Sequence, residues 1–125
     1  MHEVSTPNVP QQDGLAERSN RTIIEGARTL LMIVAHQRCG LWSEAANTVV
    51  YTTNRTLSPK DATKTKFELF TGCKPSVAHL RIFCQPVVAQ IPRAKRSGKW
   101  NPIGKVFRFV GYTRRSNTYR LFDPE

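Results

Sequence analysis

An apolar stripe in the first third of the sequence limits what this chain can fold into. No proline occurs from Leu15 to about Ala35, and apolar residues recur there at i, i+4, i+7, i+8 and i+11. These residues are Ile23, Ala27, Leu30, Leu31 and Val34. That spacing places them on one face of an α-helix, with Glu17, Arg21 and Arg28 on a different face. The helix must therefore bury its apolar face against another element.

A second helix is predicted from Trp42 to about Asn54. Its apolar stripe consists of Trp42, Ala45, Ala46, Val49, Val50 and Thr53. We expect this stripe to pack against the first one. The segment Ser58–Asp61 breaks the helical pattern, and Phe67–Phe70 reads as a short helical turn closed by Gly72.

After Pro75 the pattern changes to short strands separated by turn residues. The predicted strands are Leu80–Phe83, Pro86–Ile91, Val106–Tyr112 and Thr118–Phe122. Residues 93–102 form a polar, basic loop between two of them. The sequence therefore predicts an α+β protein with a helical part at residues 1–75 and a small β part at 76–125. Neither part is long enough to bury a large core alone.

The positive charge is concentrated in the second half of the chain. The formal net charge is +10, yet residues 1–68 hold eight Lys and Arg against seven Asp and Glu. Residues 69–122 hold eleven Lys and Arg and no acid. A polyanion is the expected partner, and nucleic acid is commoner than a membrane. The alternative is a solvated basic face without a partner.

Short apolar runs exclude a membrane-spanning segment, which needs about 20 residues. The start of the sequence also has no apolar stretch typical of a signal peptide. We therefore expect a nuclear or cytoplasmic protein that does not enter a membrane. Cys39, Cys73 and Cys84 lack CxxC spacing, so we expect reduced, buried thiols. His36 and Cys39 are a single pair, which does not suffice for a zinc site.

The segment "HEVSTPNVPQQDGLAERSNRTIIEGARTLL" resembles the last motif of the retroviral-type integrase core in its copia-type retrotransposon form. The matching residues are His2, Pro10-Gln11-Gln12-Asp13-Gly14, Glu17-Arg18 and Asn20-Arg21. Later blocks are similar to the same family in the same order: "LWSEAANTVVYTTNR", "GCKPSVAHLRIF", "IPRAKRSGKW", "FRFVGY" and "YRLFDPE". The resemblance covers nearly the whole chain.

This resemblance implies the C-terminal helices of an RNase H-like integrase core, followed by a small SH3-like β-barrel module. In that family two Asp and one Glu bind two Mg²⁺ or Mn²⁺ ions, and Glu17 matches the Glu. The two Asp precede the matched motif in the family, so we expect one of three carboxylates here. We expect no metal to be bound by this fragment alone. The alternative for Glu17 is a helix-start carboxylate favoured by the helix dipole.

The resemblance also implies DNA as the partner. Gln12, Arg18 and Arg21 would contact phosphates near Glu17; the alternative is a solvated face with a Glu17–Arg21 ion pair. A second predicted DNA-contacting group is the basic loop, through Arg93, Arg96 and Lys99. Beside it, Trp100 either stacks on a base or sugar or packs on its own barrel. Further expected partners are the N-terminal part of the integrase core and a second copy of the chain.

Two positions depart from the family pattern. Asp13 replaces the usual Asn before the glycine, and Cys84-Gln85 replaces the Gly that usually follows "LRIF" or "LRVF". Three functions stay open from the sequence. The chain is a fragment of an integrase acting in DNA binding and strand transfer, a non-catalytic nucleic-acid-binding module, or a decayed transposon remnant.

Overall fold

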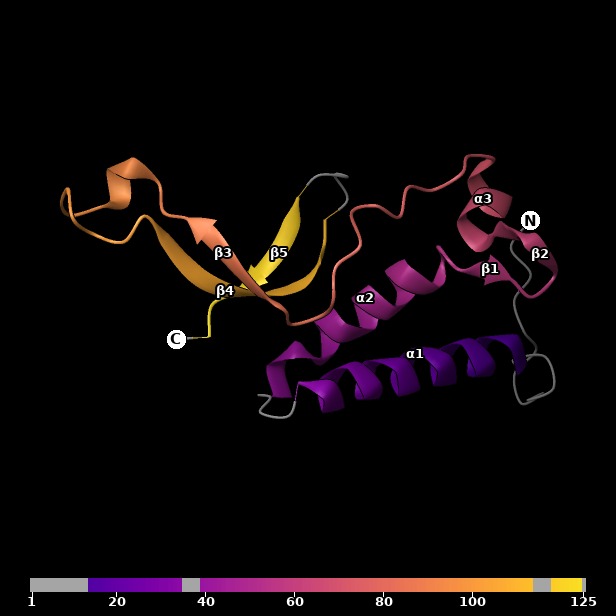
Figure 1. The fold of residues 1–125 in the computed structure, drawn as a ribbon. Coiled ribbons are helices and arrows are strands. Elements are labelled where there is room, and N and C mark those ends of the chain that lie inside the picture. Colours follow the sequence, from indigo (N-terminus) through magenta and orange to yellow (C-terminus); the bar gives the residue numbers. More distant parts are fainter. Residues whose placement is uncertain (1–13, 35–38, 114–117, 125) are drawn as a thin grey trace.

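The structure, a computed structural model, describes residues 14–34, 39–113 and 118–124, without the side chain of Cys39. Figure 1 shows a pair of long helices at one side of an antiparallel sheet. The elements in chain order are α1 (Gly14–Ile33), α2 (Trp42–Thr53), β1 (Leu57–Ser58), β2 (Asp61–Thr65), α3 (Lys66–Thr71), β3 (Pro86–Gln90), β4 (Gly104–Tyr112) and β5 (Tyr119–Phe122). Short 3-10 turns lie at Cys39–Leu41 and Arg93–Lys95.

Both predicted helices are confirmed, and their apolar stripes face each other in part. On α1, Ala27 is buried and the other residues of the stripe are half-buried. On α2, Ala45 and Val49 are buried, but Trp42 is 64% exposed, so its predicted place in the stripe is wrong. The helices approach closely because Gly26 of α1 faces the Val49 side chain: a Cβ at Gly26 would lie 2.9 Å from Val49 Cγ1.

Between α2 and α3 the chain forms a short hairpin that the sequence pattern did not reveal. Strands β1 and β2 pair antiparallel where only a helix break was predicted. The carboxylate of Asp61 accepts hydrogen bonds from the Thr63 backbone N–H (2.9 Å) and hydroxyl (2.6 Å). The predicted turn at Phe67–Phe70 is confirmed within α3. The Thr65 hydroxyl caps that helix by accepting from Glu68 N–H at 3.1 Å.

Strands β3, β4 and β5 form one antiparallel sheet in that order, so three of the four predicted strands are confirmed. The predicted strand at Leu80–Phe83 is wrong, because this stretch belongs to no strand and ends in a turn. It ends at Cys84, whose φ of 61° lies in the left-handed region. The mixed helix and sheet class is thereby confirmed.

A β-bulge directs the sheet toward α2. Phe109 pairs with Leu121 and Gly111 pairs with Arg120, which leaves Val110 as the extra residue. Phe109 and Val110 are consecutive yet both buried, at 1% and 4% exposure. Strict strand alternation would expose one of them. The bulge therefore supplies two neighbouring core residues from a single strand.

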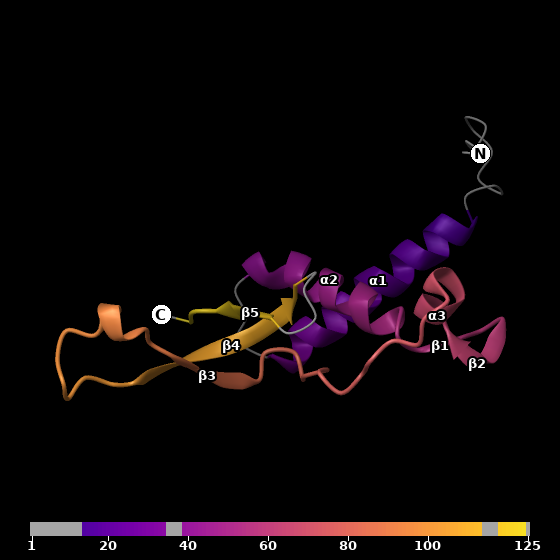
Figure 2. The same cartoon turned by 90° about the horizontal axis from the view of Figure 1, so that it is seen from above.

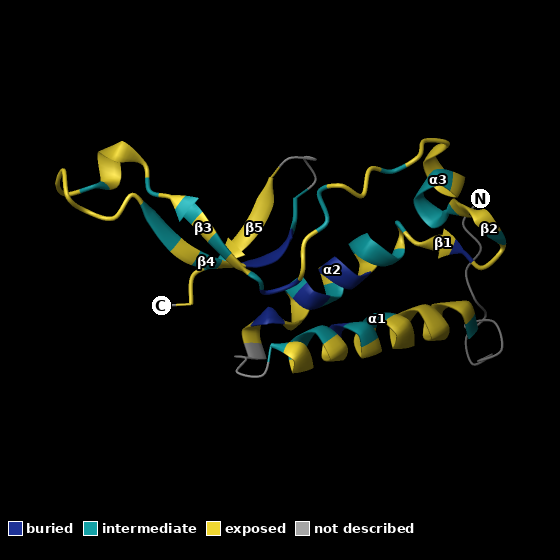
Figure 3. Ribbon diagram, viewed as in Figure 1, coloured by how far each residue is buried: buried dark blue, intermediate teal, exposed yellow. Residues whose placement is uncertain are grey.

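The core lies where α1, α2, the turn at 83–84 and β4 meet, and Figure 3 shows the buried residues gathered at this junction. Its buried members are Ala27, Leu41, Ala45, Phe83, Cys84 and Val110. Both predicted parts of the chain contribute to it, and the boundary near residue 75 stays a prediction. Of the two cysteines with described side chains, Cys84 is buried as expected; Cys73 is exposed, which corrects the expectation. None of the described helices is long and apolar enough to cross a bilayer.

Candidate nucleic-acid interface

Glu17, Arg18 and Arg21 lie in the first two turns of α1 and are exposed. The absence of proline after Gly14 and the acidic residue in the first turn favour a helix start here. Arg18 folds back along the helix, since its Nε donates to the Gly14 carbonyl at 3.1 Å. In the part of the chain that the structure describes, no ion pair joins Glu17 to Arg21. Both charged side chains therefore face solvent at the start of this helix.

A shallow hollow of about 480 Å³ runs along this face of α1. Its lining consists of Glu17, Asn20, Arg21, Ile24, Glu25 and Arg28. Magnesium and manganese prefer several oxygen ligands, and two arginines beside the carboxylates oppose a divalent cation. Among the described residues, no three His, Cys, Asp or Glu side chains are grouped to hold a metal ion. The described residues around Glu17 therefore do not fit a two-metal centre.

The basic loop connects β3 to β4 and is anchored at its base by a hydrogen bond from Ile91 N–H to the Ile103 carbonyl (2.8 Å). Arg93 and Lys99 are exposed, as is their neighbour Lys95. Arg96 is half-buried, and its Nε donates to the Ile91 carbonyl at 2.9 Å. Arg96 thus shapes the loop, while Arg93, Lys95 and Lys99 hold their charges in solvent.

Trp100 belongs to this loop and is 93% exposed. The alternative in which it packs on its own barrel is therefore wrong. Exposed apolar residues accompany it on the hairpin: Val88 (72%), Ile103 (63%) and Val106 (51%). Val88 and Val106 are paired residues of β3 and β4, so they lie side by side. The loop consequently combines cations with an uncovered indole.

The two predicted DNA-contacting groups are far apart. Figures 1 and 2 show the start of α1 near the β1–β2 hairpin at one end of the molecule and the β3–β4 loop at the other end. No small ligand can bridge them, although an extended polymer can. Gln12, another predicted contact, lies outside the described residues.

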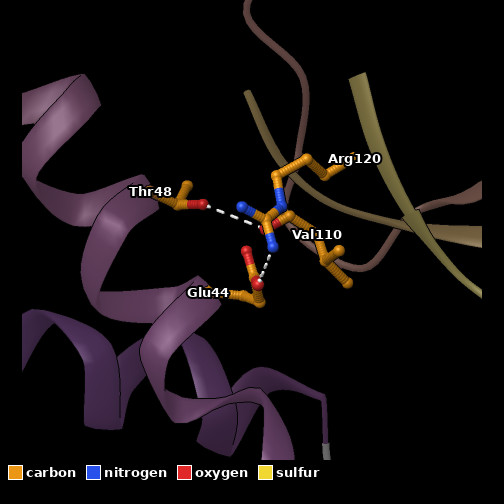
Figure 4. Close-up of polar contacts among 4 residues, drawn as sticks. All are labelled: Glu44, Thr48, Val110 and Arg120. Atoms are coloured by element: carbon orange, nitrogen blue, oxygen red, sulfur yellow. Dashed lines mark hydrogen bonds and ion pairs between the residues drawn. The ribbon is translucent and has the colours of Figure 1, made fainter. Parts of the chain in front are cut away.

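Polar contacts join the sheet to α2, and Figure 4 shows the side chains that make them. The buried Thr48 hydroxyl donates to the Val110 carbonyl at 3.3 Å, at the bulge. Nearby, the guanidinium of Arg120 on β5 donates to the Glu44 carboxylate at 2.5 Å. Arg120 is thereby engaged in holding the sheet on the helix, so its charge is partly neutralised.

A group of stacked rings extends this junction. Tyr51 of α2 stacks on Tyr112 of β4 with ring centroids 4.2 Å apart, and the Arg55 guanidinium lies 3.5 Å from the Tyr51 ring centroid. His79 meets both tyrosine rings edge-on, and its Nε2 lies 2.6 Å from the Tyr51 hydroxyl. Burial raises the pKa of the Tyr112 hydroxyl. Sequence reasoning missed this cluster; the one signal for it was the i, i+4 spacing of Tyr51 and Arg55.

These features were compared with known proteins. Residues 85–125 match the family described as the retroviral polymerase SH3-like domain. The chain is 34% identical over 123 residues, 98% of its length, to the retrovirus-related Pol polyprotein from transposon TNT 1-94 of Nicotiana tabacum, and covers 9% of that protein. It is 30% and 29% identical to the Pol polyproteins from transposons RE2 and RE1 of Arabidopsis thaliana, over 94% of this chain and 8% of each relative. No solved structure matches the chain significantly.

The chain therefore spans less than a tenth of the length of these relatives. The matched family covers β3, the basic loop, β4 and β5, that is, the whole three-stranded sheet. The relatives cover the helices as well. A retroviral polymerase SH3-like domain is thus present at residues 85–125, in a chain that resembles, over nearly its whole length, a segment of copia-type retrotransposon Pol polyproteins.

Proposed function

We propose that this chain is the C-terminal part of a retrotransposon integrase and that it binds DNA for metal-dependent strand transfer during DNA integration. Its helices would belong to the RNase H-like core, and its basic sheet would hold the duplex. The similarity to Pol polyproteins over nearly the whole chain supports this assignment. The order of matched segments, from the motif around Glu17 to the last strand, supports it further.

The observation that carries the DNA-binding proposal is the charge of the β3–β4 loop. Arg93, Lys95 and Lys99 are exposed within a segment, residues 69–122, that contains no carboxylate. The acid just beyond it, Asp123, is paired with Lys105 at 2.8 Å. Unopposed cations on a protruding loop attract a polyanion and release its counterions on binding.

Catalysis would require the intact enzyme. Glu17 is the one inherited carboxylate that the sequence match supplies, and its described neighbours do not complete a metal site. In the intact integrase, Mg²⁺ or Mn²⁺ bound by three carboxylates would activate the attacking oxygen. We therefore expect the 125-residue chain to join no DNA ends in either metal. Strand-transfer product that disappears in Glu17→Gln would contradict this.

The DNA-binding proposal is tested by fluorescence anisotropy with several duplexes of unrelated sequence, each titrated at several salt concentrations. We expect similar affinities for all duplexes, falling steeply with salt, with a log–log slope of about one unit per phosphate contacted. Binding that is independent of salt, or absent at low salt, would contradict the proposal.

A further inference from the structure

The β3–β4 loop presents the Trp100 indole to solvent within a hydrogen-bonded turn at residues 97–101. Asn101 N–H donates to the Gly98 carbonyl at 3.3 Å, and the Asn101 side chain bonds the Ser97 hydroxyl. These bonds close the backbone around Lys99 and Trp100. Residues 97–103 of this loop are all exposed, and Figure 3 shows most of the loop as exposed. A large ring held in water gains no burial energy until a ligand covers it.

The charges around Trp100 define what can cover it. Lys99 is adjacent, and Arg93 and Lys95 belong to the same loop, all exposed. The segment has no carboxylate to attract a basic partner. A ligand that is both anionic and planar matches this combination, and nucleotides have both properties. Phosphates would pair with the cations while a base covers the indole.

Duplex DNA does not offer such a base, because each ring face is already covered by its neighbours in the stack. An unpaired base exposes its face and can stack on an aromatic side chain with little regard to sequence. We propose that Trp100 is a stacking platform for an unpaired base, so that this loop binds single-stranded DNA in preference to duplex. This inference rests on the proposed DNA binding and adds the form of DNA that the loop prefers.

The test uses intrinsic fluorescence in a Trp42→Phe background, because Trp42 and Trp100 are the two tryptophans of the chain. The probes are an oligo(dT) of about ten nucleotides, within the span that single-strand-binding modules cover, and a duplex of equal length. We expect oligo(dT) to quench Trp100 and the duplex to leave its emission nearly unchanged. Oligo(dT) that binds by anisotropy without altering the emission would overturn the proposal.

Affinity measurements with variants separate stacking from charge. We expect Trp100→Ala to weaken oligo(dT) binding by about 5- to 150-fold with an unchanged salt slope, and Trp100→Phe to retain most of the affinity. Duplex affinity should change less than twofold. The matched control is Trp42→Ala, which removes the other exposed indole (64%) and should leave oligo(dT) binding intact.

Two outcomes would reject the stacking role. One is an equal loss of single-strand and duplex affinity in Trp100→Ala. The other is unchanged oligo(dT) binding with loss of a dimer in sedimentation, which would assign the indole to contact with a second copy of the chain. In both cases salt-dependent duplex binding by the parent chain would still support the proposed function. Failure of the stacking proposal is therefore distinguishable from failure of the proposed DNA binding.

Discussion

Cys84 holds a backbone conformation that favours glycine. Its φ of 61° is the one positive value at a non-glycine position within the described residues. A β-carbon in this region costs about 1–2 kcal/mol per residue because it approaches the following carbonyl. The resemblance described in the sequence analysis implies a glycine where Cys84-Gln85 stands. The turn at 83–84 thus adopts a backbone geometry typical of glycine while placing a buried thiol in the core.

Substitutions at Cys84 separate strain from burial. Cys84→Gly and Cys84→Ala both remove the buried sulfur, but only glycine removes the strained β-carbon. We expect Cys84→Gly to be more stable than Cys84→Ala by about 1 kcal/mol. Urea unfolding of the two variants measures this difference. An alanine variant as stable as the glycine variant would show that the turn carries no strain.

The rate of alkylation of the Cys84 thiol would not measure this backbone strain, because the surroundings of the thiol also change its pKa. Burial raises the pKa of the Cys84 thiol, while Arg108 nearby lowers it in part. The reactive thiolate is therefore scarcer at neutral pH than for a free cysteine. The free energy of unfolding measures the backbone strain at Cys84 without this effect on the thiol.

At the scale of elements, the α1–α2 contact depends on one glycine. A Cβ at Gly26 would lie 2.9 Å and 3.0 Å from the two Cγ atoms of Val49. Valine has a stiff χ1 in a helix, so it cannot turn away. Glycine at position 26 lowers the helix propensity of α1, but it lets the two helices approach closely.

We expect Gly26→Ala to destabilise the chain by about 1–2 kcal/mol through overpacking, although alanine favours helix by about 1 kcal/mol. In a Val49→Ala background the same change should be neutral or stabilising. Gly14→Ala is the matched control, because no atom of the described residues lies within 4 Å of its added Cβ. Thermal unfolding of this set measures the coupling. Equal effects of Gly26→Ala in both backgrounds would contradict the contact.

Helices were predictable because the 3.6-residue period of α1 and α2 coincides with their buried faces. The strand at Leu80–Phe83 was predicted wrongly because the sequence alternation does not match burial: Ile82 is 74% exposed, whereas the consecutive residues Phe83 and Cys84 are both buried at a turn where Cys84 has a left-handed φ. The β1–β2 hairpin was missed because its residues are mostly polar and exposed. Side-chain hydrogen bonds to Asp61, not an apolar period, support its turn.

The candidate site was predictable in charge and not in geometry. An acid-free segment must be basic wherever it folds, so the loop at 93–102 was found from the sequence. The sequence left the exposure of Trp100 open as one of two alternatives. The engagement of Arg120 with Glu44 was not foreseeable, because it depends on how the sheet meets α2 near the bulge at Val110. A bulge has no distinct signal in "VFRFVGY".

At the scale of the whole molecule, α1 exposes apolar residues on more than one side. Leu15, Ile24, Met32 and Ile33 are exposed at 77%, 53%, 79% and 70%. Exposed apolar residues in this number favour association with another surface. In the isolated chain, a second copy is the available partner.

We expect concentration-dependent self-association in sedimentation experiments. Ile24→Gln with Ile33→Gln should reduce it while changing unfolding stability little, because both side chains are already exposed. Leu57→Gln on β1, 57% exposed, is the matched control and should not change it. A chain that is monomeric at all concentrations would contradict this expectation.

The central claim is that the β3–β4 loop, and not net charge in general, binds DNA. Arg93→Gln with Lys99→Gln removes two exposed charges from the loop while Arg96 keeps its structure. Lys60→Gln with Lys64→Gln removes two exposed charges at the β1–β2 hairpin, at the opposite end of the molecule (Figure 1).

The decisive measurement is the salt dependence of duplex binding for these two variants and the parent chain. We predict that the loop variant binds more weakly, with a log–log slope reduced by about one unit for each phosphate that the loop no longer neutralises, while the hairpin variant keeps the parental slope. Equal slopes in both variants would show that the loop is only a solvated turn, and the central claim would be wrong.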